Sequence, residues 1–219
     1  MNKLSLIVLF VVLNTFNVQA NHIPESLFGI KLNHPLSFDD ISEYIDQKNN
    51  ADGEEEWIFN KAGIDKILAN NESYLPNPMF MDIRVITDAN KIVKTIRGFV
   101  AKQREPTFFE KILDECKQNK TKIKNVLETK HNIKFTNKLL TSTDSNGVIF
   151  MDYDYIIHKG QNIKLELMCN YFSKNYYKQN NLTYFLGLYL TNNNYEGWTI
   201  FSEVDSIDFD LLFTDSSGL

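Results

Sequence analysis

Apolar and polar residues follow regular patterns along the chain, and the period of the pattern changes from segment to segment. Residues 81–100 alternate on both sides of the polar run 87–90, which predicts a β-hairpin closed by Asn90 in a left-handed conformation. Residues 108–130 repeat apolar side chains at helical spacing after a T-x-x-E capping box, which predicts a long helix. Weaker signals predict a strand at 28–32, a helix from Ser37, a polar loop at 46–56, a helix at 57–70 and a turn-rich stretch at 136–146.

The last third of the chain is rich in period-two alternation, which predicts four strands, at 148–157, 163–171, 182–191 and 198–204. A three-residue loop with Gly160 in the left-handed position would place Tyr155 opposite Ile163 and Asp154 opposite Lys164. A hairpin, a long helix and a four-strand meander together predict an α+β fold. We expect a mainly antiparallel sheet with helices packed on one face.

The N-terminus has the pattern of a secretory signal peptide. Lys3 precedes a run of about ten apolar residues, which is too short to span a membrane, and Val18-Gln19-Ala20 offers a small-x-small cleavage site. The sequence therefore predicts a signal peptide at 1–20 and a single mature domain at 21–219, with fraying from about residue 206. It predicts a periplasmic or extracellular location.

Charge narrows the range of partners. The net charge of the whole chain is −5, and removal of residues 1–20 takes away only Lys3, so the mature chain has a charge of −6. An acidic protein is repelled by phosphates, which argues against nucleic acid and against an anionic membrane surface. No further apolar run is long enough to cross a bilayer, so we expect no membrane insertion after cleavage.

The chain has two cysteines, Cys116 and Cys169. Cys116 lies on the apolar stripe of the predicted helix and Cys169 on the apolar face of a predicted strand. If that helix packs on that sheet, the two thiols meet in one core, and an oxidising compartment favours their pairing. The alternative is two buried free thiols that act as small apolar residues.

Motifs for catalysis, metal binding and cofactor binding are absent from the sequence. The four histidines and the cysteine pair lack zinc-site spacing, and no nucleophile elbow, P-loop or dinucleotide fingerprint occurs, so we expect no metal and no cofactor. One group of residues could bind a metal or transfer a proton. Asp152 and Asp154 share a strand face, and His158 follows at the turn. The alternative interpretation is a solvated face on which Asp154 pairs with Lys164. Glu166, opposite Asp152 in the same register, would add an uncompensated like charge unless it is exposed or bound to a metal, and this keeps the chemical interpretation open.

Aromatic residues are concentrated in the last third of the chain, and exposed tyrosine and tryptophan are common contact residues in recognition. Those in or next to loops are the candidates for binding: Tyr176, Tyr177, Tyr195 and Trp198. Antiparallel sheets also favour aromatics for structural reasons, which is the competing explanation.

The function predicted from the sequence is that of a non-enzymatic exported protein that binds another macromolecule, such as an envelope or extracellular protein. The alternative is a secreted hydrolase or metal-binding protein with a site around Asp152, Asp154 and His158. A structural or assembly role in the envelope has the same sequence features as the first hypothesis.

Overall fold

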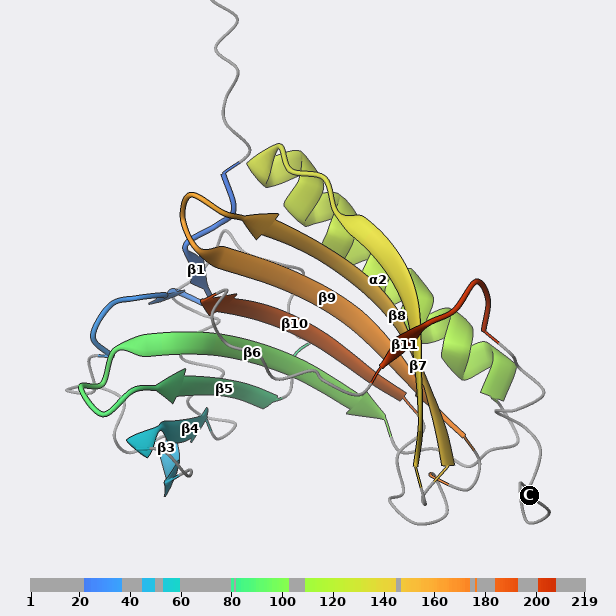
Figure 1. Cartoon of the computed structure of the whole chain (residues 1–219), viewed down its shortest axis with the longest axis horizontal. Helices are drawn as coiled ribbons and strands as arrows, with labels where there is room; N and C mark the ends of the chain where they lie inside the picture. The colour runs from blue at the N-terminus through green and yellow to red at the C-terminus, as the bar shows by residue number, and fades with distance from the viewer. Residues whose placement is uncertain are drawn as a thin grey trace, which may run out of the picture.

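The computed structural model describes residues 22–36, 45–49, 53–59, 80, 82–102, 109–144, 147–173, 176, 184–192 and 201–207. Most of these residues belong to one antiparallel sheet with the strand order β11-β7-β8-β9-β10-β6-β5-β4-β3 (Figure 1). The strands of the sheet are β3 (Ile45–Asn49), β4 (Glu55–Phe59), β5 (Asp82–Thr87), β6 (Val93–Lys102), β7 (Thr136–Asp144), β8 (Gly147–His158), β9 (Ile163–Phe172), β10 (Tyr184–Asn192) and β11 (Ser202–Glu203). Two short strands near the N-terminus, β1 (Ser26–Leu27) and β2 (Ile30–Lys31), form a separate hairpin.

The fold is mainly β, so the predicted α+β fold with helices packed on one face of the sheet is wrong. The described residues contain one helix, α2 (Phe109–His131), beside the nine-stranded sheet. Three strands were missed. β3 and β7 have mostly polar sequences and lie in stretches assigned to a loop and to turns, whereas β4 joins two glutamates of the predicted loop to the Trp57-Ile58-Phe59 start of the predicted helix at 57–70. Strands at or near the edge of a sheet bury less surface and need fewer apolar residues, so their alternation is weak.

Helix α2 confirms the predicted long helix, and it ends at His131, just before a residue that favours a left-handed conformation. Asn132 follows the last helical residue with a φ of 49°, the left-handed conformation that commonly ends a helix. The Glu128 side chain then accepts a hydrogen bond from the backbone N–H of Phe135 at 3.0 Å. The buried side of α2 contains Cys116, Ile123 and Leu127, and the helix contacts β9 and β10.

The predicted hairpin at 81–100 is confirmed as β5 and β6, with one correction in its turn. The Asp88 carboxylate accepts hydrogen bonds from the backbone N–H groups of Asn90 and Ile92, at 2.9 and 3.0 Å. The left-handed residue is Lys91, with a φ of 63°, rather than Asn90. The predicted strand at 28–32 is instead the tight β1–β2 hairpin, in which Phe28 and Gly29 both have positive φ.

The register of β8 and β9 differs from the predicted one. His158 pairs with Ile163, so four residues join the strands, and Asn162 rather than Gly160 is left-handed. Asp154 therefore lies opposite Leu167, and the predicted pairing with Lys164 is wrong. The prediction failed because both faces of these strands are buried, so apolar alternation does not show which faces match.

Each face of the sheet has its own apolar cluster. The larger one lies on the face that α2 contacts and includes Phe150, Leu167 and Leu186. The smaller one lies on the opposite face and is built around Met151, Met168 and other side chains of β6, β8 and β10. Because alternate residues of a strand point to opposite faces, this arrangement buries nearly every side chain of β9.

Candidate functional site

A large open cleft lies between helix α2 and the sheet. Its volume is about 970 Å³, at the upper end of the range for ligand sites. One wall is the side of α2 that presents Asp114, Lys117, Lys120, Thr121, Lys124 and Asn125. The floor is formed by Asn137, Leu139, Asp152, Asp154 and Tyr171, and the residues after β11, 205–207, border it. This cleft is the candidate functional site.

Regular spacing brings these side chains together. Lys117, Lys120 and Lys124 are three and four residues apart, so they lie on one side of the helix. Asp152 and Asp154 are two residues apart on β8 and point to the face that α2 covers. The neighbouring strand β7 adds Asn137, which lies opposite Asp154 in the register.

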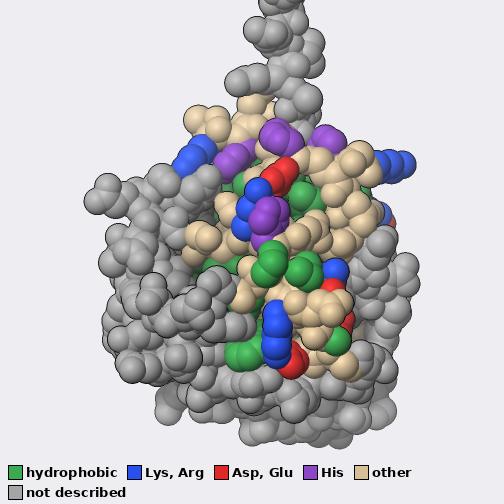
Figure 2. Space-filling model, turned by 90° about the vertical axis from the view of Figure 1, so that its left-hand side faces the viewer, with side chains coloured by type: hydrophobic (Ala, Val, Ile, Leu, Met, Phe, Trp, Pro, Cys, Tyr) green, Lys and Arg blue, Asp and Glu red, His purple; other side chains and the backbone are tan. Residues whose placement is uncertain are grey.

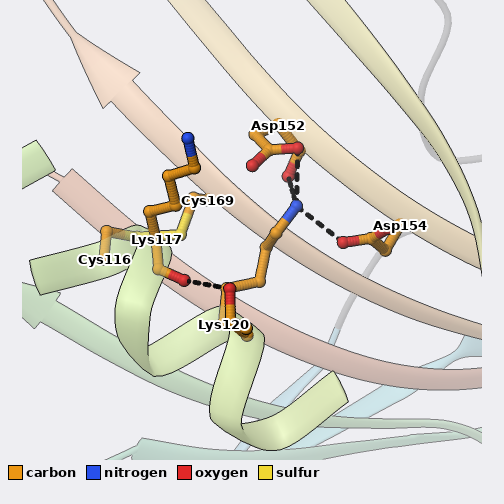
Figure 3. Close-up of a disulfide and its surroundings, with 7 residues drawn as sticks. Cys116, Lys117, Lys120, Asp152, Asp154 and Cys169 are labelled. Atoms are coloured by element: carbon orange, nitrogen blue, oxygen red, sulfur yellow. Dashed lines mark hydrogen bonds and ion pairs between the residues drawn. A yellow bond between two sulfur atoms is a disulfide. The ribbon is translucent and has the colours of Figure 1, made fainter. Parts of the chain in front are cut away.

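Lys120 reaches from the helix wall to the floor, where its ammonium lies between the carboxylates of Asp152 and Asp154 (Figure 3). Its Nζ is 2.6 Å from Asp152 Oδ1 and 2.6 Å from Asp154 Oδ2, and it donates a third bond to the backbone carbonyl of Asp152 at 3.2 Å. Only 5 % of the Lys120 side chain and 1 % of the Asp154 side chain are exposed. An ammonium has three N–H donors, so Lys120 is fully bonded.

Two further groups complete the floor. Lys124 Nζ is 2.6 Å from Asp154 Oδ1, and the Asn137 amide donates to Asp152 Oδ1 at 2.7 Å. Two lysines of the wall thus balance two aspartates of the floor, and these four groups together have no net charge. Burying charges is costly unless they are paired and hydrogen-bonded, and both conditions are met here.

The floor shifts the pKa values of two groups in opposite directions. Burial by itself raises the pKa of Asp154, but Lys120 and Lys124 outweigh it and hold that pKa below its ordinary value. The pKa of Tyr171 is raised, first by burial and then by the negative charges of Asp152 and Asp114. Asp154 is therefore ionised and Tyr171 neutral at neutral pH.

Of the three residues in the predicted chemical constellation, the structure brings together two. Asp152 and Asp154 meet at the cleft floor, on the covered face of β8. His158 is four residues further along the strand, about 13 Å from Asp154, and its Nδ1 accepts a hydrogen bond from the backbone N–H of Gln161. Glu166 lies on the other face, where it binds Tyr153 and Lys164.

His158 belongs to a different end of the molecule. Its ring lies 6.3 Å from the ring of His22, edge to face, next to the β8–β9 turn. Figure 2 shows the side of the molecule that is on the left in Figure 1. Histidine side chains gather toward the top of its described surface, among lysine, arginine and acidic groups. Within the described residues, no three side chains of the histidine, cysteine, aspartate or glutamate type form a group that could hold a metal ion.

One of the four predicted aromatic contact residues lies within the described part of the chain. Tyr176 is partly buried and its ring stacks on Phe172, with 4.6 Å between centroids. Tyr177, Tyr195 and Trp198 lie outside the described residues.

The disulfide predicted from the sequence is present in the structure and lies beside the cleft. Cys116 and Cys169 are joined, and both side chains are fully buried. Cys116 is on α2 between the wall residues Asp114 and Lys117, and Cys169 lies directly opposite Asp152 in the sheet. The bond therefore fixes the wall to the floor (Figure 3).

Lys120 and Lys124 were not among the predicted site residues, because lysines along a helix are usually on its solvated side. One signal was available. The buried helix residues Cys116, Ile123 and Leu127 follow helical spacing, and Lys120 falls within the same stripe, four residues after Cys116. A lysine inside an apolar stripe indicates a buried carboxylate partner.

Searches of protein-family models, curated proteins and solved structures found no match to this chain. Among the described residues, no helix is long and apolar enough to cross a membrane. A disulfide is typical of proteins in oxidising compartments.

The lowered pKa of Asp154 predicts a loss of stability in acid. A carboxyl group whose pKa is lower in the folded state stabilises the fold above its unfolded value, near 3.8, and this contribution is lost as the pH falls through the folded value. For one proton the slope reaches at most about 1.4 kcal/mol per pH unit. We expect chemical denaturation between pH 7 and pH 2 to show a smaller acid dependence in Asp154→Asn than in the wild type.

A matched control for this experiment is Asp205→Asn, which changes an exposed aspartate at the border of the same cleft. Its acid dependence should equal that of the wild type. If Asp154→Asn also retained the full wild-type dependence, the ion cluster would not be its source.

Proposed function

We propose that this chain is an exported protein that binds a polypeptide segment of an extracytoplasmic partner protein in the cleft between α2 and β7–β8. The observation that carries this proposal is the chemical character of the cleft, which is large and open, is lined by charged, polar and aliphatic groups, and has a floor whose charges are already paired. The signal-peptide pattern at 1–20 and the disulfide support export.

The groups that line the cleft suit a peptide chain. A peptide presents backbone donors and acceptors, and the amides of Asn125 and Asn137 and the hydroxyls of Thr121 and Ser206 offer both. Leu139 adds an aliphatic surface for side chains. The wall from residue 114 to 125 is about 16 Å long, which matches about five residues of extended chain.

The paired floor favours binding over catalysis. A general base or nucleophile needs an accessible group with a free lone pair or proton. Asp154 is almost fully buried and bonded to two lysines, and Lys120 uses all its donors. The hydrolase or metal-binding alternative needs His158 near both carboxylates and a cation between them. In the structure Lys120 occupies that central position.

Site-specific photo-cross-linking tests the proposal. A photoreactive residue is placed in the mature protein at Asn125, which lines the cleft, or at Lys122, which is exposed on the same helix but does not line it. Each protein is irradiated with envelope and extracellular fractions of the source organism, and adducts are identified by mass spectrometry. We expect one polypeptide adduct at position 125, absent at 122.

A charge-reversal variant then tests whether the adduct forms in the cleft. The Lys117→Glu change should reduce the yield at position 125, because it reverses an exposed charge on the cleft wall. An adduct that forms equally at both positions, an adduct with carbohydrate, or no adduct at all would contradict a polypeptide ligand in this cleft.

A further inference from the structure

Two aspartates of the cleft have carboxylate oxygens without a partner among the described residues. Asp114 is exposed at the start of the helix wall and makes no ion pair there. The Asp152 carboxylate bonds to Lys120 and Asn137 through Oδ1 alone. Figure 3 shows its second oxygen turned away from the Lys120 ammonium. Both carboxylates can therefore accept further hydrogen bonds from a group in the cleft.

Tyr171 adds a third oxygen. It lies on β9, and it lines the cleft although only 3 % of the residue is exposed. Its hydroxyl makes no hydrogen bond within the described residues and is not fully enclosed. A buried tyrosine hydroxyl normally has a hydrogen-bond partner. A hydroxyl that borders the cleft without one indicates that a ligand supplies the partner.

These three groups come from three elements that meet at the disulfide. Cys169 lies directly opposite Asp152 in the sheet, and its disulfide holds α2 at this point. Asp114 is two residues before the helix cysteine, and Tyr171 is two residues after Cys169 on the same face of β9. Burial contributes most to the raised pKa of Tyr171, and the carboxylates of Asp152 and Asp114 are close enough to raise it further. A ligand group here meets two negative charges and a neutral oxygen.

The charges of the cleft favour a basic group at this position. Four aspartates and three lysines line the cleft, so its lining has a net charge of −1. Two of the lysines are bonded to the floor, and the third, Lys117, is left for an acceptor of the segment such as a backbone carbonyl. An arginine or lysine side chain has several N–H donors that point in different directions, which suits acceptors on three different elements.

We propose that the position between Asp114, Asp152 and Tyr171 binds an arginine or lysine side chain of the partner's segment. That the basic group belongs to a polypeptide rests on the proposed function, whereas the preference of this position for a basic group does not. The charge of −6 on the mature chain also favours the approach of a basic segment.

Titration with short peptides tests this preference. The probes are acetylated and amidated pentapeptides, Ala-Thr-X-Thr-Ala, with arginine, lysine or glutamine at X. Binding to the ¹⁵N-labelled mature protein is followed by NMR at the side-chain amides of Asn125 and Asn137, which line the cleft. We expect a basic peptide to bind at least about tenfold more tightly than the glutamine peptide, because a neutral amide lacks charge-assisted hydrogen bonds.

Two variants locate the basic group. Tyr171→Phe removes only a hydroxyl that makes no hydrogen bond within the described residues, and Asp114→Asn neutralises an exposed side chain, so both variants should fold. Each should weaken the binding of the basic peptide by about three- to tenfold and leave that of the glutamine peptide within about twofold. Glu25→Gln removes an exposed carboxylate outside the cleft and should change neither affinity.

The outcomes separate this proposal from the proposed function. Equal affinities for basic and neutral peptides, unchanged affinities in Tyr171→Phe and Asp114→Asn, or binding of Ca²⁺ in place of the basic peptides would overturn the basic site. A photo-cross-linked segment at Asn125 that contains no arginine or lysine would also overturn it and leave the polypeptide-binding cleft standing. Tight binding of a basic peptide without any polypeptide adduct at Asn125 would support the basic site and contradict the proposed function.

Discussion

Replacing Lys120 with methionine should lower the free energy of unfolding by about 3–5 kcal/mol, the cost of leaving buried charges without their partner. The substitution keeps an unbranched side chain in a site that is 95 % buried but removes the cation from between Asp152 and Asp154. The two carboxylates would then depend on Lys124 and Asn137 alone. Equilibrium unfolding in urea, monitored by circular dichroism, measures the loss.

The matched control is Lys117→Met, one turn earlier on the same helix and exposed on the same cleft wall. Because Lys117 is exposed and makes no ion pair within the described residues, this variant should lie within about 0.5 kcal/mol of the wild type. Adding Asp152→Asn and Asp154→Asn to Lys120→Met should recover part of the lost stability, since no buried charge then lacks a partner. Similar losses for Lys117→Met and Lys120→Met would show that the cluster has no special role.

Removing the disulfide should cost about 4 kcal/mol. The chain-entropy model gives this value for a bond that joins cysteines 53 positions apart, because the bond restricts the unfolded chain. Alanine at both positions is the appropriate replacement, since both side chains are fully buried. Urea unfolding of the double variant, compared with the oxidised wild type, measures the change.

The wild type unfolded in the presence of a reductant provides the control, because it lacks the cross-link but keeps both cysteines. Its stability should match that of the double alanine variant within the small cost of two shortened side chains. A loss below about 1 kcal/mol in both samples would show that the bond contributes little to the stability of the fold.

The disulfide and the cleft are linked through the same elements. Cys116 and Lys120 lie one turn apart on α2, and their partners Cys169 and Asp152 lie directly opposite each other on β9 and β8. A covalent bond and a buried ion cluster thus hold α2 to the sheet over a short distance. The cleft wall keeps its position relative to the floor in the absence of a ligand, which reduces the cost of ordering it on binding.

Local patterns alone were sufficient to predict several elements. The long helix follows from its apolar spacing, and the β5–β6 hairpin follows from alternation around a polar turn. The pairing of Cys116 with Cys169 follows because both lie on apolar positions of elements that must pack together. Each of these inferences depends on the chain's own periodicity, which does not change with the rest of the fold.

Other features were decided only by the tertiary structure. The period of β8 shows that Asp152 and Asp154 share a face, but it does not show that α2 covers that face. Lysines on a helix are solvated unless a carboxylate meets them, and the carboxylates that bind Lys120 are 32 and 34 positions away in the sequence. The polar edge strands likewise form only because neighbouring strands supply their hydrogen bonds. The sequence thus determined which residues lie together on each element, and packing between elements decided which of them form the site.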